Sequence, residues 1–187
     1  MRIGVAQFKP IAGELSANLT QHKQLIELAA CKGGDVLIFP ELSLTGYEPK
    51  LAKKLATSLN DPRLDELQAL SDTLRLTVGV GMPLASSTGV QIGMIVFQPG
   101  QPRQSYSKQH LHADELPYFV NGSGQMILRV KNHSIAPAIC YESLLSHHSA
   151  AARKAGADIY VASVAKSARG VDKAFKHFPE IAQQHSM

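Results

Sequence analysis

Short apolar runs alternate with amphipathic segments along the chain, and this alternation predicts strands that are separated by helices. Runs of about four to eight residues rich in Val, Ile and Phe, bounded by Gly, Pro or Asn, are typical of buried strands. On this basis, strands are expected at residues 2–8, 36–39, 77–82, 93–98, 103–108, 126–130, 134–139 and 158–164. Two of the connections, at Pro99 with Gly100 and at residues 131–133, are expected to be hairpin turns.

Segments with an apolar residue at every third or fourth position predict the helices. Asn18 is the expected N-cap of the first helix, and Asp61 followed by Pro62 marks the start of the second. The last helix is expected to be interrupted or kinked at Pro179. In all, helices are expected at residues 19–32, 61–74, 144–155 and 171–184.

Helix-separated strands combined with hairpins indicate a layered α/β domain with a mixed sheet. Parallel neighbours need a crossover connection, usually a helix, whereas hairpins produce antiparallel neighbours. The sequence contains no repeat, low-complexity tract or linker. Residues 1–187 are therefore expected to form a single domain.

Composition narrows the class of protein without identifying it. With 44% hydrophobic and 18% charged residues, the 187-residue chain resembles an ordinary globular protein. Its formal charge of +4 is scattered, which argues against a nucleic-acid partner. The apolar runs are too short for a signal peptide or a membrane helix, and two cysteines are too few for a disulfide framework. We therefore expect a cytoplasmic protein with no membrane partner.

Three of the expected strands end at a chemically reactive residue. Glu41 follows "DVLIFP", Lys108 ends "RQSYSK" and Cys140 follows "IAPAI". Ligands gather beyond strand ends in helix-covered sheets, so these side chains can converge and form a nucleophilic site. Each residue alone also fits a structural role, as a solvated turn, a surface lysine or a buried apolar cysteine. Cys31 falls at the end of an expected helix, where a structural role is expected.

The segments that contain these three residues resemble the signature segments of one family. They read "FPELSLTGY" at residues 39–47, "YSKQHL" at 106–111 and "ICYES" at 139–143, in the family's order. In these segments the chain resembles the nitrilase, or carbon–nitrogen hydrolase, superfamily. The resemblance covers essentially the whole chain, including "AGADIYVAS" after the cysteine segment and the first strand and helix entry with Gln7, Pro10, Gly13 and Asn18.

The resemblance implies an α-β-β-α sandwich and a Glu–Lys–Cys triad. Carried over by position, Glu41 is the general base, Lys108 the lysine and Cys140 the nucleophile, and Glu115 in "HADELPYF" matches a further family glutamate. The implied activity is hydrolysis of a non-peptide carbon–nitrogen bond in a small-molecule amide through a thioester intermediate. Lys108 and the backbone N–H of Tyr141 are expected to stabilise the oxyanion. No metal and no organic cofactor is expected.

Other functions stay open at this point. One is a nitrilase-like domain that does not turn over a substrate or that works only with a partner. The family also includes nitrile hydrolases and acyl transferases, which "ICYE" does not separate from amidases. A metal hydrolase is a further alternative, because His110 and His112 alternate on an extended segment and His147 with His148 adds imidazoles.

Two departures from the family pattern affect these expectations. "YESLLSHHS" stands where many members have an Arg or a Phe-Pro-Glu element beside the pocket, so the identity of the amide stays open. Family members are usually longer, so strands after Met187 are expected to be missing. An open sheet edge predicts an aggregation-prone or partner-dependent domain with weak catalysis. The resemblance also implies a homo-oligomer.

Overall fold

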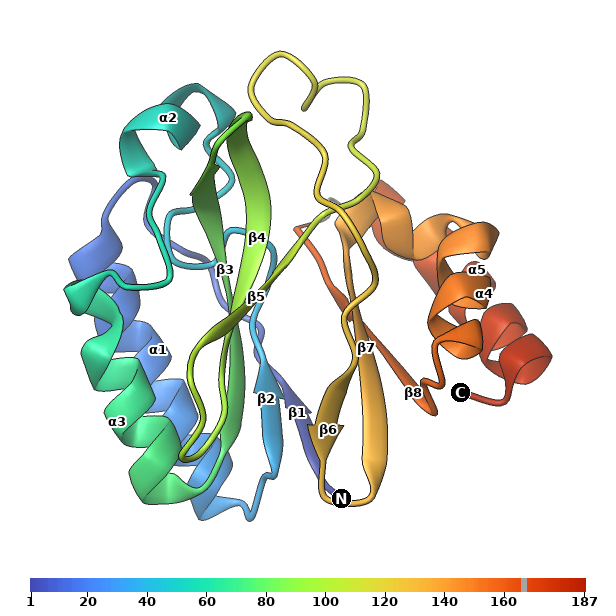
Figure 1. Cartoon of the computed structure of the whole chain (residues 1–187), viewed down its shortest axis with the longest axis horizontal. Coiled ribbons are helices and arrows are strands. Elements are labelled where there is room, and N and C mark those ends of the chain that lie inside the picture. Colours follow the sequence, from blue (N-terminus) through green and yellow to red (C-terminus); the bar gives the residue numbers. More distant parts are fainter. Residues whose placement is uncertain (166–167) are drawn as a thin grey trace.

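The computed structural model describes residues 1–165 and 168–187, and it shows two β-sheets packed between two layers of helices (Figure 1). The larger sheet has the strand order β1-β2-β3-β4-β5 and the smaller has the order β6-β7-β8. The strands are β1 (Ile3–Val5), β2 (Val36–Ile38), β3 (Thr77–Ser86), β4 (Gly89–Phe97), β5 (Gln104–Ser107), β6 (Leu128–Val130), β7 (His133–Ile139) and β8 (Ile159–Ser163).

Both sheets are mixed, as the sequence predicts. β1, β2 and β3 run parallel to one another, whereas β3, β4 and β5 are joined as antiparallel hairpins. In the smaller sheet, β7 is antiparallel to β6 and parallel to β8. Both predicted hairpins are therefore confirmed, and each parallel pair has a helix in the connection between its strands, as a crossover requires.

Helices cover the outer face of each sheet (Figure 1). α1 (Leu15–Cys31) and α3 (Asp65–Leu74) lie on the larger sheet, and α4 (Ser146–Lys154) and α5 (Ala168–His185) lie on the smaller. This arrangement confirms the α-β-β-α sandwich. The chain also forms α2 (Ala52–Leu55) and 3-10 turns at Pro49–Leu51, Pro62–Leu64 and Cys140–Leu144. Over the described residues, no helix has the length and apolar character that crossing a membrane requires.

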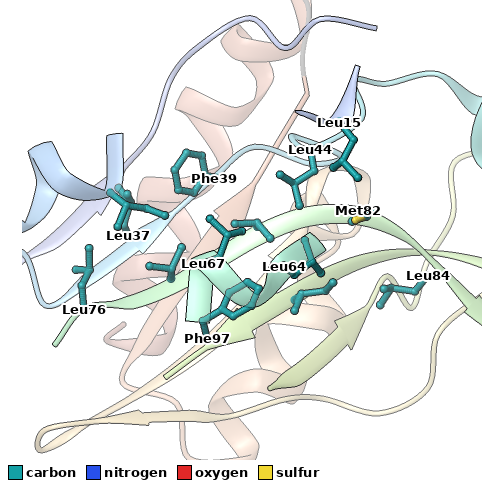
Figure 2. Packing of buried hydrophobic residues seen from close by; sticks show 14 residues of the cluster. Leu15, Leu37, Phe39, Leu44, Leu64, Leu67, Leu76, Met82, Leu84 and Phe97 are labelled. Carbon is teal, nitrogen blue, oxygen red and sulfur yellow. The ribbon is translucent and has the colours of Figure 1, made fainter. Parts of the chain in front are cut away.

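The continuous apolar runs are explained by strands that are buried on both faces. In β2 and the residue after it, Val36 and Ile38 pack between the two sheets, whereas Leu37 and Phe39 pack against the helices. Successive side chains of a strand point to opposite faces, so a strand covered on both sides must be apolar throughout. Figure 2 shows Phe39 and Phe97 of the larger sheet together with Leu64 and Leu67 from the helical layer.

The predicted cap of the first helix is wrong. α1 begins at Leu15, so Asn18 lies within its first turn and does not precede it. The buried Asn18 side chain pairs instead with the loop before the helix, accepting from the Ile11 N–H (2.7 Å) and donating to the Ile11 carbonyl (2.8 Å). It also donates to the carbonyl of Leu44 (3.0 Å). Asn18 therefore joins two loops and does not cap its own helix.

Most other differences from the sequence-based elements lie at their ends. β1 is shorter than predicted, and β3 and β4 are longer because they meet in a tight turn that apolar periodicity does not reveal. In this turn the Ser86 hydroxyl accepts from the Thr88 N–H (3.3 Å) and donates to the Gly89 carbonyl (2.8 Å). Such a local hydroxyl bond closes a turn without a proline or an Asn-Gly pair.

Two predicted helices differ in their continuity. The helix expected at residues 144–155 begins only at Ser146, because Leu145 has an extended backbone (ψ 115°) that separates α4 from the 3-10 turn before it. The interruption expected in the last helix at Pro179 is wrong, because α5 runs continuously from Ala168 to His185, whereas a kink there stays a prediction. Ala174 and Ile181, on either side of the proline, are both buried.

Candidate active site

Glu41 lies in a turn that crosses the face of β3. The N–H of Leu44 donates to the carbonyl of Gly81 (3.0 Å), which seats the turn on that strand. A Cβ atom at Gly81 would lie 2.3 Å from the Leu42 nitrogen and 2.9 Å from the Glu41 carbonyl carbon. Glycine is therefore required at this position of β3, because any side chain would displace the segment that carries Glu41.

A buried histidine supports the same turn from the helical side. His22 of α1 contacts the Asn18 carbonyl through Nδ1 (2.7 Å) and the Ser43 hydroxyl through Nε2 (2.9 Å). Only a protonated Nδ1 can pair with a carbonyl, so the Ser43 hydroxyl donates to Nε2. The same hydroxyl accepts from the Gly81 N–H (3.0 Å). Burial lowers the pKa of His22 to about 4, which keeps the ring neutral at neutral pH.

This buried histidine predicts a loss of stability in mild acid. The unfolded chain takes up a proton near pH 6.5, whereas the folded chain does so only near its pKa of about 4. The free energy of unfolding should therefore fall as the pH is lowered through this window, by up to ~3 kcal/mol from His22. Urea denaturation at several pH values measures the slope. His22→Asn should be less stable at pH 7 and show a flatter pH dependence, and an unchanged slope would contradict the assignment.

Lys108 follows β5 and is fully buried between two carboxylates. Its ammonium donates to Oε1 of Glu41 (2.8 Å) and to Oε1 of Glu115 (2.7 Å). The three residues are 0%, 2% and 2% exposed, respectively. Burial acts to lower the pKa of Lys108, but the two carboxylates outweigh it and raise the pKa above the ordinary value. The lysine is therefore a fixed positive charge inside the protein.

The two carboxylates have different surroundings. Glu115 accepts two further hydrogen bonds, from the Tyr47 hydroxyl (3.0 Å) and from the His112 N–H (2.7 Å). By contrast, Oε2 of Glu41 is buried and has no nitrogen or oxygen donor among the described residues. Burial raises the pKa of Glu41, although Lys108 opposes this effect. Of the two carboxylates, Glu41 is thus better suited to take up a proton.

Cys140 stands where β7 ends and a 3-10 turn begins. Its φ of 49° lies in the left-handed region, which is uncommon for a residue with a side chain and often marks a functional site. Its Sγ lies 3.8 Å from the Ala165 carbonyl oxygen. Burial raises the pKa of Glu41, and a hydrogen bond with the Cys140 side chain is among the opposing effects. The thiol and the Glu41 carboxylate therefore interact.

The structure brings together the three residues that the sequence analysis grouped. Glu41 joins the other two, since it pairs with Lys108 and contacts Cys140. Glu41 and Lys108 follow strands of the larger sheet, whereas Cys140 follows a strand of the smaller one. Glu115, the further glutamate suggested by the resemblance, also lies in the cluster, while the neighbouring Asp114 is exposed and pairs with His112.

A cleft of about 770 Å³ opens beside Glu41. Its described walls come from β1 and the loop after it, from the Glu41 turn, from the end of β8 and from α5. Apolar groups such as Phe8, Tyr47, Ala165 and Phe175 form much of the lining. A small organic molecule fits a volume of this size.

This geometry predicts that Cys140 is the more reactive of the two cysteines. Its side chain interacts with Glu41 in the cluster that also holds the Lys108 ammonium, and a nearby cation favours a thiolate, whereas Cys31 is exposed at the end of α1. In the folded protein at pH 7, iodoacetamide should modify Cys140 at least ~10-fold faster, as measured by peptide mapping. In urea the two rates should become similar. Faster modification of Cys31 in the folded protein would contradict the site, because exposure alone would then govern the rate.

The other residues singled out in the sequence have different outcomes. Tyr141 follows Cys140, and its ring lies 5.1 Å from that of His112, but the oxyanion role of its N–H stays a prediction. His110 pairs with His147 (Nε2 to Nε2, 3.2 Å), whereas His112 pairs with Asp114. Within residues 1–165 and 168–187, no group of three or more His, Cys, Asp or Glu side chains is arranged to hold a metal ion. The metal-hydrolase alternative gains no support.

Two residues of the site were present in the quoted segments but received no role from the sequence. Tyr47, the last residue of "FPELSLTGY", donates to Glu115. Glu142, in "ICYES", is fully buried and accepts four hydrogen bonds. A carboxylate two positions after Cys140 can be recognised in the sequence, but its hydrogen-bond donors cannot.

The chain folds as an α-β-β-α sandwich and groups a buried lysine, two carboxylates and a strand-end cysteine, as the resemblance to carbon–nitrogen hydrolases implies. The family model for carbon-nitrogen hydrolases matches residues 2–186. The chain therefore belongs to the carbon–nitrogen hydrolase family.

Curated relatives share part of their length with this chain. The glutamine-dependent NAD(+) synthetase of Thermotoga maritima is 27% identical over 146 residues, which is 75% of this chain and 25% of that protein. That of Xylella fastidiosa (strain Temecula1) is 31% identical over 148 residues, 75% of this chain and 27% of that protein. The omega-amidase YafV of Escherichia coli is 25% identical over 119 residues, 62% of this chain and 45% of that protein. The chain thus spans about a quarter of the synthetases.

Solved structures show the same fold. An amidase from Nesterenkonia sp. AN1 in complex with butyramide superposes with a TM-score of 0.90 at 20% sequence identity, covering 100% of this chain and 74% of the amidase. A second structure of that amidase, with acrylamide added to its active-site cysteine, gives a TM-score of 0.89 at 19% identity, covering 100% and 76% of the two chains.

Proposed function

We propose that the chain hydrolyses the carbon–nitrogen bond of a carboxamide, with Cys140 as the nucleophile. The observation that carries this proposal is the buried ammonium of Lys108, held between Glu41 and Glu115 in a cluster that also contacts the thiol. Burying a charged lysine is costly unless it is paired, and a fixed cation is useful where an oxyanion develops. Acyl transfer is a reaction in which such an oxyanion develops.

In the first half-reaction, Glu41 accepts the thiol proton through Oε2, which has no nitrogen or oxygen donor among the described residues, while Sγ of Cys140 bonds to the amide carbon. The Lys108 ammonium, with the Tyr141 N–H as a second donor, stabilises the resulting oxyanion. When the oxyanion collapses, the carbon–nitrogen bond breaks, and the nitrogen leaves with the proton held by Glu41. A thioester on Cys140 remains.

In the second half-reaction, water replaces the departed amine. Glu41 takes a proton from this water, and the oxygen attacks the thioester carbon. Collapse of the second oxyanion breaks the carbon–sulfur bond, and the thiolate recovers its proton from Glu41. The products are a carboxylic acid and ammonia or an amine, and the atoms balance without a metal or an organic cofactor.

Primary carboxamides are the proposed substrate class. The relatives support it by name, since they include glutamine-dependent synthetases and an omega-amidase, and the Nesterenkonia amidase was solved with butyramide. Glutamine and butyramide both carry a terminal carboxamide. The apolar groups that line much of the cleft suit an uncharged aliphatic amide.

Ammonia release from butyramide, glutamine and other primary amides tests the proposal. The parent protein should release ammonia, and Cys140→Ala should release none above background. Added hydroxylamine should divert the acyl group to a hydroxamate, as expected for a thioester. Cys31→Ala is the matched control, because it removes the exposed thiol, and it should retain full activity.

The alternatives give distinct results in the same assays. Ammonia from butyronitrile without ammonia from any amide would favour a nitrile hydrolase. Rapid alkylation of Cys140 without any turnover would favour a domain that is non-catalytic or that needs a partner. Undiminished amide hydrolysis by Cys140→Ala would refute the proposal outright.

A further inference from the structure

Glu142 is a buried carboxylate that the proposed chemistry does not use. Its Oε1 accepts from the Tyr106 hydroxyl (2.6 Å) and from the Ile139 N–H (2.8 Å). Its Oε2 accepts from the N–H groups of Gln109 (2.6 Å) and His110 (3.2 Å). A carboxylate that accepts four hydrogen bonds cannot move freely, and it restrains the groups that donate to it.

These four donors come from the two segments that carry Lys108 and Cys140. Gln109 and His110 directly follow the lysine, and Ile139 directly precedes the cysteine. Glu142 is therefore a bridge between the lysine segment of the larger sheet and the nucleophile turn of the smaller sheet. One side chain thus ties the backbone beside Lys108 to the backbone beside Cys140.

A chain of hydrogen bonds continues from Glu142 into the smaller sheet and its helix. The Tyr106 hydroxyl, whose proton goes to Glu142, lies 2.9 Å from Nε2 of His148 in α4. Nδ1 of His148 lies 2.7 Å from the hydroxyl of Tyr160 in β8. Burial lowers the pKa of His148 to about 4, so its ring is neutral and carries a single N–H.

Gln109 joins this set of bonds through its side chain. Its NH2 group donates to the Tyr106 hydroxyl oxygen (3.0 Å) and lies 3.1 Å from Nε2 of His148. Tyr106, His148 and Gln109 therefore hold one another as well as Glu142, and hydrogen bonds linked in this way strengthen one another.

Cys140 has a backbone that needs external support. Its φ of 49° is unfavourable for a residue with a side chain and persists only where the surroundings over-determine it. Glu142 supplies that support at the same turn, through its bond from the Ile139 N–H. Without this bond, the turn can relax toward an ordinary backbone and move the sulfur.

We propose that Glu142, anchored by Tyr106 and His148, is a positioning residue that keeps the Cys140 thiol within reach of Glu41 and the Lys108 ammonium. This inference rests on the proposed function of the same site. It adds a residue that neither reacts nor contacts the substrate. Its role is measurable through the behaviour of the thiol itself.

The test is the pH dependence of Cys140 alkylation in Glu142→Gln, in a Cys31→Ala background so that a single thiol reacts. A glutamine cannot accept on both sides, because its NH2 group would face either the Gln109 and His110 N–H groups or the Ile139 N–H. The midpoint of the iodoacetamide rate profile should move up by about one pH unit, since the thiolate loses its cation. On the best amide substrate, kcat should fall at least ~10-fold with little change in KM.

Tyr106→Phe is the second variant and decides the matter if Glu142→Gln does not fold. It removes one donor to Glu142 and breaks the link to His148, while the three backbone donors remain. The profile should shift in the same direction by a smaller amount. Glu27→Gln changes an exposed glutamate of α1 and serves as the matched control, which should leave both the profile and the activity unchanged.

The outcomes separate positioning from simple stabilisation. A lowered melting temperature with an unmoved alkylation profile and unchanged kcat would overturn the proposal, and so would an unmoved profile in Tyr106→Phe. The alkylation assay needs no turnover. A shifted profile in a parent protein that hydrolyses no amide would therefore support the positioning role while contradicting the proposed function.

Discussion

Glu41→Gln is expected to abolish amide hydrolysis while leaving the fold intact. A glutamine oxygen can still accept from Lys108, but the residue no longer takes the proton from the thiol or returns it to the leaving nitrogen. The loss of a general acid–base group lowers rates by about 10²- to 10⁴-fold. Steady-state kinetics of ammonia release would measure the loss, and circular dichroism would establish that the structure is retained.

The matched control for this experiment is Glu66→Gln, at an exposed glutamate that pairs with Lys23 on the surface. It should keep the parental rate. The stability of Glu41→Gln should not fall much, because the substitution removes a fully buried carboxylate, one oxygen of which has no nitrogen or oxygen donor in the part of the chain that the structure describes. Turnover within a few-fold of the parent would mean that another group accepts the thiol proton.

Lys108→Met is expected to lose both activity and stability. The substitution leaves the carboxylates of Glu41 and Glu115 buried without their cation, and breaking a buried ion pair from one side costs roughly 3–5 kcal/mol. It also removes the charge that stabilises the oxyanion. Chemical denaturation would measure the change in the free energy of unfolding, and the ammonia assay would measure the loss of turnover.

The pH dependence of this variant provides an internal check. Without the lysine, nothing offsets the effect of burial on Glu41, so its pKa rises further above the unfolded value, and the destabilising effect is smallest in acid and grows as the pH increases. The deficit should therefore be smaller at pH 4 than at pH 7. Lys23→Met, which removes a partly exposed ion pair, should cost no more than ~1 kcal/mol. A similar cost for both lysines would contradict the buried charge network.

The fold and the central side chains could be predicted from the sequence because the strands are buried on both faces. β2 and the last five residues of β7 are continuous apolar runs, and Glu41 and Cys140 come after them as polar or reactive residues. The ordered segments around these residues added the family resemblance and, with it, the sandwich. That Glu41, Lys108 and Cys140 lie together depends on how the two sheets pack, so the sequence alone does not show it.

Other features could not be predicted because they depend on contacts between distant segments. Asn18 has the character of a helix cap, yet the burial of its side chain against the Ile11 and Leu44 loops decides its role. Glu142 carries a visible charge, but its four donors come from segments about 30 residues apart as well as from its own turn. Composition and periodicity contain no information on such partners.

The site combines residues from two different sheets, and this has a consequence for the order of folding. Glu41 and Lys108 belong to a sheet that can pair through its own hairpins and crossovers, whereas Cys140 arrives with the other sheet. Pairing within a sheet brings no thiol to the carboxylate, so the reactive centre exists only after the two sheets have docked. During refolding, fast alkylation of Cys140 should thus lag behind the recovery of secondary structure. The chemistry of one sulfur atom would then report the final assembly of the whole sandwich.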